Sequence, residues 1–79
     1  MDPRKWRKSK GLSQVALAER LGLESRGRMS DLENGVVRWP TDLAIAMDRV
    51  SDGEVPVAEL RADLHDVRVV RRSEAQASA

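Results

Sequence analysis

The residues best suited to recognise a ligand lie in one short polar segment, residues 25–34. Met29 and Leu32 form its apolar stripe at helical spacing. The side chains that face away from that stripe are Arg26, Gly27, Arg28, Ser30, Asp31 and Asn34. An arginine can donate two hydrogen bonds to guanine O6 and N7, and an asparagine can pair with the edge of an adenine. The segment therefore presents the donors and acceptors that are needed to read a base-pair edge.

Catalytic and metal-binding patterns are weak by comparison. The single His65 lies between Asp63 and Asp66, but one histidine without cysteine is a poor metal set, and a solvated surface is the favoured interpretation. Ser9, Ser13 and His65 have neither a nucleophile elbow nor a third group to orient them. We therefore expect no enzyme, no metal site and no cofactor.

Length and composition set the class of protein. The chain has 79 residues and no cysteine, which allows one small domain without disulfides or thiolate zinc sites. No apolar run approaches the ~20 residues that span a bilayer, and the first residues lack the apolar segment of a secretory signal. We expect a cytoplasmic protein with no membrane partner.

The formal net charge of +1 conceals an uneven distribution. Residues 1–39 hold nine Lys and Arg against five Asp and Glu, which is a net charge of +4. Residues 40–79 hold five Arg against eight acids, which is a net charge of −3. Because the positive half contains the polar segment 25–34, the near-neutral total does not exclude nucleic acid as a partner.

Local capping signals predict three short helices in the first half of the chain. Each helix begins at a polar or Pro-containing start and closes at a glycine that tolerates positive φ. The predicted starts and ends are Asp2-Pro3 and Gly11, Ser13 as N-cap and Gly22, and Ser25 and Gly35. Gly27 in the first turn of the third helix costs about 1 kcal/mol relative to Ala, so this helix is intrinsically weak.

The second half is predicted to hold two further helices and an arm. Thr41 is expected to cap a fourth helix that ends at residues 51–53, and a fifth helix is expected over residues 56–64 with Val57, Leu60 and Leu64 inward. The fold class is all-α, a compact bundle of four to five short helices. We divide the chain into a helical domain (1–64), a strand or docking arm (65–72) and a frayed tail (73–79).

The spacing of the first half is that of a helix-turn-helix, with small Ala18 at the crossing and Gly22 in the turn. The residues that carry it are Gly11-Leu12-Ser13-Gln14, Leu17-Ala18-Glu19-Arg20-Leu21-Gly22-Leu23 and Met29-Ser30-Asp31-Leu32-Glu33-Asn34-Gly35. Over residues 6–50 this pattern resembles the Cro/phage-repressor (XRE-like) family, and residues 41–64 resemble its YdaS/Cro-like subgroup. One residue more than the family's usual spacing separates Gly22 from Met29, which shifts the helix register by about one position.

The resemblance implies roles for particular residues, because family members place the third helix in the major groove. It implies base contacts from Arg26, Arg28, Ser30, Asp31 and Asn34. It implies phosphate contacts from Lys10, Ser13, Gln14, Ser25, Arg38 and Trp39, although Trp39 could equally pack on the fourth helix. It also implies an ion pair between Arg7 and Glu33 that joins the first and third helices.

These observations favour a sequence-specific transcriptional regulator that binds double-stranded DNA. The expected form is a small repressor. One recognition helix provides too little interface for tight specific binding, so we expect a homodimer on an inverted repeat with half-site centres about 34 Å apart. Val67, Val69 and Val70 are the predicted dimer contacts. The alternative is a protein-interaction module, such as an antitoxin or antiactivator, that uses the same scaffold and the acidic second half.

Overall fold

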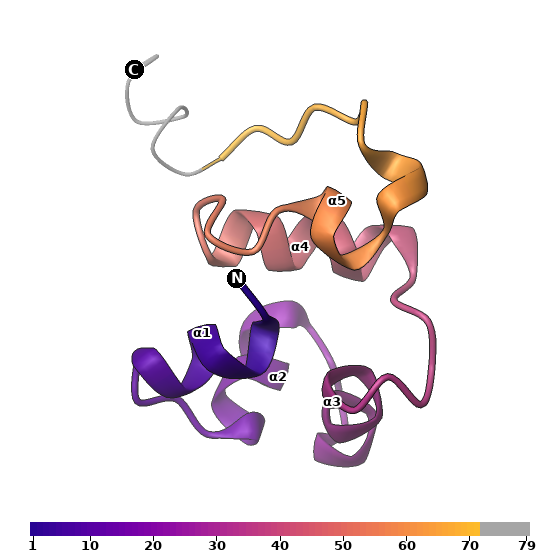
Figure 1. Cartoon of the computed structure of the whole chain (residues 1–79). Helices are drawn as coiled ribbons and strands as arrows, with labels where there is room; N and C mark the ends of the chain where they lie inside the picture. The colour runs from indigo at the N-terminus through magenta and orange to yellow at the C-terminus, as the bar shows by residue number, and fades with distance from the viewer. Residues whose placement is uncertain (72–79) are drawn as a thin grey trace.

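Every regular element in the described part of the protein is helical. The computed structural model describes residues 1–71. The elements are α1 (Pro3–Ser9), α2 (Gln14–Leu21), α3 (Arg26–Glu33), α4 (Thr41–Val50), α5 (Val57–Leu60) and a 3-10 turn (Ala62–Leu64). Helices α1, α2 and α3 form one layer, α4 crosses over it, and α5 and the C-terminal segment lie on the far side of α4 (Figure 1). The all-α prediction is confirmed.

Side-chain caps begin the first three helices, and glycines with positive φ follow their ends. The carboxylate of Asp2 accepts from backbone N–H groups two and three residues on, at 2.8 and 3.3 Å. The hydroxyls of Ser13 and Ser25 each accept from the N–H three residues on, at 3.0 and 3.1 Å. Helix α2 ends at Gly22 with φ of +76°, which glycine adopts without strain. These boundaries follow the capping signals in the sequence.

One hydrophobic core lies where α2, α3 and α4 meet. Its fully buried large apolar side chains are Leu17, Met29, Met47 and Val55. Helix α2 packs against α3, and the small side chain of Ala18 on α2 is buried. Trp6 is also buried, and its indole N–H donates to the Glu54 carboxylate.

Trp39 belongs to this core as well. Only 6% of its surface is exposed, and its indole Nε1 donates to the backbone carbonyl of Leu32 at 3.2 Å, at the end of α3. Of the two roles weighed for Trp39, packing is therefore the one observed. The predicted phosphate contact needs an accessible ring, so the placement of Trp39 argues against it.

The N-cap of helix α4 lies one residue earlier than the sequence predicted. Thr41 is the first helical residue and Pro40 occupies the N-cap position, without a side-chain cap. The carbonyl of Pro40 accepts the first helical hydrogen bond, from the N–H of Ala44 at 2.9 Å. The prediction of Thr41 as N-cap was therefore wrong by one residue.

The fifth helix is shorter than the predicted range 56–64. Arg61 leaves the helical region with φ of −137° and ψ of 93°, which separates Val57–Leu60 from the 3-10 turn Ala62–Leu64. At this break, the Arg61 guanidinium donates to the Asp63 carboxylate at 2.9 and 2.7 Å and to the Trp39 carbonyl at 3.1 Å. The apolar side chains predicted to face inward are buried or partly buried: Val57, Leu60 and Leu64.

Residues 65–71 run back along α4 as an irregular segment, without strand structure (Figure 1). Val69 is buried in the core, and Arg71 Nε lies 2.9 Å from the carboxylate of Asp48, which is itself buried. Val67 and Val70 stay exposed. The segment is thus an arm docked on its own domain, and Val69 faces inward instead of toward a second chain. Arg72 and the tail predicted for 73–79 lie outside the described residues.

Candidate nucleic-acid interface

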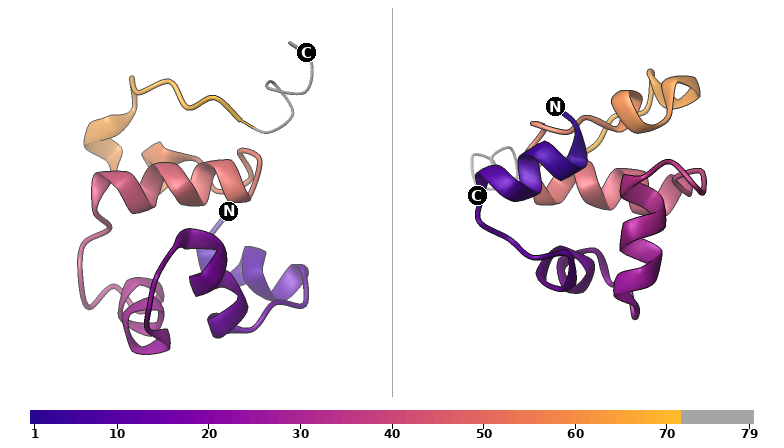
Figure 2. Two further views of the ribbon diagram at one scale, coloured as in Figure 1. Left: turned by 180° about the vertical axis from the view of Figure 1, so that it is seen from behind. Right: turned by 60° about the horizontal axis from the view of Figure 1, so that its bottom comes forward.

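Helix α3 presents one open face at an edge of the molecule. It lies at the periphery in each view of the ribbon (Figures 1 and 2), joined to α2 by the short turn 22–25. Met29 and Leu32 are buried beneath it. The exposed positions of α3 and its C-cap are Arg26, Gly27, Arg28, Asp31 and Asn34, while Ser30 is half-buried. This is the set that the apolar stripe of residues 25–34 predicted to face outward.

Arg26 and Arg28 are available for an external partner. Neither guanidinium takes part in a hydrogen bond or an ion pair within residues 1–71. Both lie in the first turn of α3, where the positive end of the helix dipole adds to the positive electrostatic potential of the two guanidinium groups. Asp31 is exposed one turn later and brings an acceptor to the same face.

Ser30 and Asn34 are already engaged with neighbours. The amide nitrogen of Asn34 donates to Ser30 Oγ at 3.2 Å, and its amide oxygen accepts from the Arg4 guanidinium. Asn34 therefore ties the end of α3 to α1. A base contact from this side chain requires the bond to Arg4 to open.

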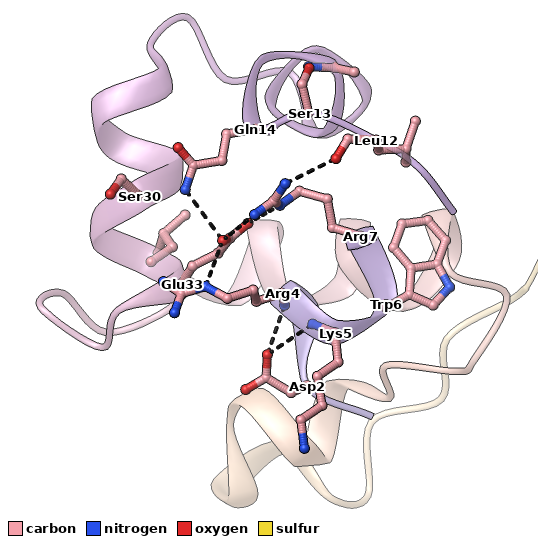
Figure 3. Close-up of polar contacts among 12 residues, drawn as sticks. Asp2, Arg4, Lys5, Trp6, Arg7, Leu12, Ser13, Gln14, Ser30 and Glu33 are labelled. Carbon is pink, nitrogen blue, oxygen red and sulfur yellow. Dashed lines mark hydrogen bonds and ion pairs between the residues drawn. The ribbon is translucent and has the colours of Figure 1, made fainter. Parts of the chain in front are cut away.

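A buried carboxylate below this face joins three helices (Figure 3). Glu33, whose side chain is fully buried, accepts from Arg7 Nε at 2.8 Å and Arg7 Nη2 at 3.2 Å. It also accepts from Arg4 Nε and from Gln14 Nε2, each at 3.3 Å. Arg7 in turn donates to the carbonyl of Leu12 at 2.9 Å. The implied Arg7–Glu33 ion pair is present, and the network holds α3 against α1 and the start of α2.

The network keeps Glu33 ionised. Burial by itself raises the pKa of this carboxyl, but the hydrogen bonds from Arg7, Gln14 and Arg4 together outweigh burial, so the pKa lies below its usual value. A charged acceptor makes stronger hydrogen bonds than a neutral one. The position of α3 therefore depends on a carboxylate that stays charged at neutral pH.

The predicted phosphate contacts at the helix starts differ in their availability. Ser13 and Ser25 are exposed, and their oxygens accept the capping bonds, which leaves each hydroxyl hydrogen able to donate to a phosphate. Gln14 is turned inward, since its amide nitrogen donates to Glu33. Its side chain therefore stabilises the fold of the site and does not point outward toward a ligand.

The two basic residues of the predicted phosphate set form exposed ion pairs. Lys10 Nζ lies 3.6 Å from Glu54 Oε2, and Arg38 Nη2 lies 3.3 Å from Asp63 Oδ1. The Arg38 side chain is 71% exposed. Because exposed pairs of this kind contribute about 0–1 kcal/mol, a phosphate can replace either carboxylate at small cost.

A sequence model described as helix-turn-helix matches residues 4–46, which include α1, α2, α3 and the first part of α4. The chain belongs to the Cro/XRE-like helix-turn-helix family. It is a family of DNA-binding regulators and not of enzymes, so the matched region is a DNA-binding unit. The resemblance to this family is confirmed, and the YdaS/Cro-like subgroup stays a prediction. No curated protein matches the chain, and no solved structure does.

In this helix-turn-helix, two partners of Glu33 were not predicted as such from the sequence. The sequence did not place Arg4 in this network, and Gln14 was predicted to contact phosphate. The available signal was position, since Arg4 precedes Arg7 by one helical turn and therefore shares its face. Gln14 follows the Ser13 cap, but the direction of its side chain depends on where α3 ends.

Within residues 1–71 no group of three His, Cys, Asp or Glu side chains is arranged to hold a metal ion. No helix there has the length and apolar character to cross a membrane.

Proposed function

We propose that the protein is a sequence-specific transcriptional repressor that binds double-stranded DNA as a homodimer, with α3 in the major groove. The observation that carries this proposal is the exposed face of α3, where Arg26 and Arg28 have no partner within residues 1–71. A cytoplasmic location, in association with the nucleoid when DNA is bound, follows from the same proposal.

The dimensions of α3 suit this role. Its eight residues make a rod about 12 Å long, and the major groove is about 12 Å wide and 8.5 Å deep. Entry by the N-terminal turn places Arg26 and Arg28 nearest the base edges, where each can donate two hydrogen bonds to a guanine. Asp31 lies one turn back, where it can accept from cytosine N4.

Phosphate contacts on both sides of α3 would set its orientation. Ser13 and Ser25 lie at the starts of α2 and α3, and Arg38 lies in the loop that follows α3. Lys10 joins this set if it exchanges Glu54 for a phosphate. Such contacts fix register and contribute affinity, whereas the side chains of α3 supply sequence preference.

A second copy is needed because one short recognition helix buries too little surface for tight specific binding. A two-fold dimer would present two α3 helices to half-sites about 34 Å apart. Val67 and Val70 are the arm residues available for that contact, since Val69 is part of the core.

The test is selection from a random-sequence duplex library, followed by a footprint on the enriched sequence. The proposal predicts an enriched inverted repeat, protected over two half-sites, with affinity that falls as salt concentration rises. Reporter expression from a promoter that overlaps the enriched site should decrease when the protein is present. Absence of any enriched sequence at moderate salt would refute DNA recognition and would favour the protein-interaction module instead.

A further inference from the structure

One glycine in the chain has no backbone reason to be glycine. Of the five glycines, four have positive φ and lie after helix ends: Gly11, Gly22, Gly35 and Gly53. Gly27 is the exception, because it lies inside α3 without a positive φ. Glycine is also the poorest helix former apart from proline.

Packing does not require glycine at this position either. A Cβ added to Gly27 would meet only Ser25 Oγ, at 3.6 Å, which is an ordinary van der Waals contact. The residue is exposed, so the protein itself leaves room for a side chain. Alanine would therefore strengthen a helix of only eight residues.

The position of Gly27 points to what occupies that room. Successive residues of a helix are about 100° apart, so Arg26 and Arg28 flank Gly27 on the outer face, opposite the buried Met29 and Leu32. On a helix that enters the major groove, this point faces the floor of the groove between the two guanidinium groups.

We infer that Gly27 marks the closest approach of the α3 backbone to a base-pair edge, at a separation that excludes any side chain. The inference rests on the proposed function. It makes Gly27 a determinant of sequence specificity, because the lack of a side chain lets the backbone come close to the bases. Adding Cβ would push the helix outward by about the length of one C–C bond, about 1.5 Å. Hydrogen bonds from Arg26 and Arg28 to base edges would then be too long.

The decisive experiment uses Gly27→Ala with the duplex that the wild-type protein enriches from a random library, and with a scrambled duplex of equal composition. Gly27→Ala should raise the Tm by about 4 °C, because alanine is the better helix former. Its affinity for the enriched duplex should fall at least about tenfold, while its affinity for the scrambled duplex should stay unchanged.

Thr41→Ala is the matched control, because it also places alanine at an exposed position in the first turn of a helix, but on α4. It should retain wild-type affinity for both duplexes. Equal affinity of Gly27→Ala and wild type for the enriched duplex would overturn the inference, as would an equal loss on both duplexes or the same loss in Thr41→Ala. Failure of the wild-type protein to enrich any duplex would instead refute the proposed function.

Discussion

Glu33→Gln is the substitution that best tests how the recognition helix is held. The variant keeps the shape of the side chain and one carbonyl oxygen, but replaces the other oxygen with an NH2 group. The Arg7 Nε–H, now 2.8 Å from Glu33 Oε2, would then face a donor, and the largely buried guanidinium would lose its counter-charge. The expected loss is about 2–4 kcal/mol in the free energy of unfolding at pH 7.

That loss should depend on pH in a defined direction. The pKa of Glu33 is lower in the folded protein than its ordinary value, so the unfolded chain binds the proton more readily. The stabilisation from the carboxylate is therefore complete above the unfolded pKa, and it is lost as pH falls through the folded pKa. Glutamine does not titrate, so the difference in stability between wild type and Glu33→Gln should shrink as pH falls below the ordinary carboxyl pKa of about 4.3.

Urea unfolding followed by circular dichroism at pH 7 and at pH 3 measures both effects. Glu19→Gln is the control, because Glu19 is exposed on α2 and its substitution should change stability by less than about 0.5 kcal/mol. A difference below about 1 kcal/mol at pH 7 would refute the view that this carboxylate holds α3. A difference that is the same at both pH values would refute the assigned direction of the pKa.

Three further predictions follow from the same geometry. Arg28→Ala should lose about 1–3 kcal/mol of binding free energy on the enriched duplex and relax one base position, whereas an equal loss on scrambled DNA would show a phosphate contact instead. The double variant Val67→Asp/Val70→Asp should shift sedimentation toward monomer with little change in Tm, because both valines are exposed; a dimer that survives would place the interface elsewhere. Asp63 should titrate at a pKa of about 2, chiefly because Arg61 donates hydrogen bonds to its carboxylate. In Arg61→Gln, an NMR titration should find the pKa of Asp63 near its ordinary value, and an unchanged pKa would contradict that cause.

The first three helices were predictable because their signals are local. An N-cap such as Ser13 acts on an N–H three residues away, and the left-handed conformation at Gly22 depends on the residue itself. The outward face of α3 was predictable for a related reason, since the apolar spacing of Met29 and Leu32 determines the opposite side of a helix. The Arg7–Glu33 pair was implied by family resemblance.

Two side-chain directions that the sequence did not predict involve residues distant in the sequence. The guanidinium of Arg61, the residue that follows α5, donates to the Trp39 carbonyl, 22 residues earlier in the sequence. Gln14 turns inward because Glu33 lies beside it in the fold, 19 residues away along the chain. Neither direction follows from helical periodicity or capping.

The sequence by itself therefore determined the helix-turn-helix family, the limits of α1, α2 and α3, and the residues that α3 exposes. These depend on interactions within a few residues, which are present in any chain with this order of amino acids. Tertiary structure alone decided that Trp39 and Val69 are buried, and that Arg71 reaches Asp48. The physical reason is that burial and long-range ion pairs depend on which segments meet, and those meetings exist only after the helices have packed.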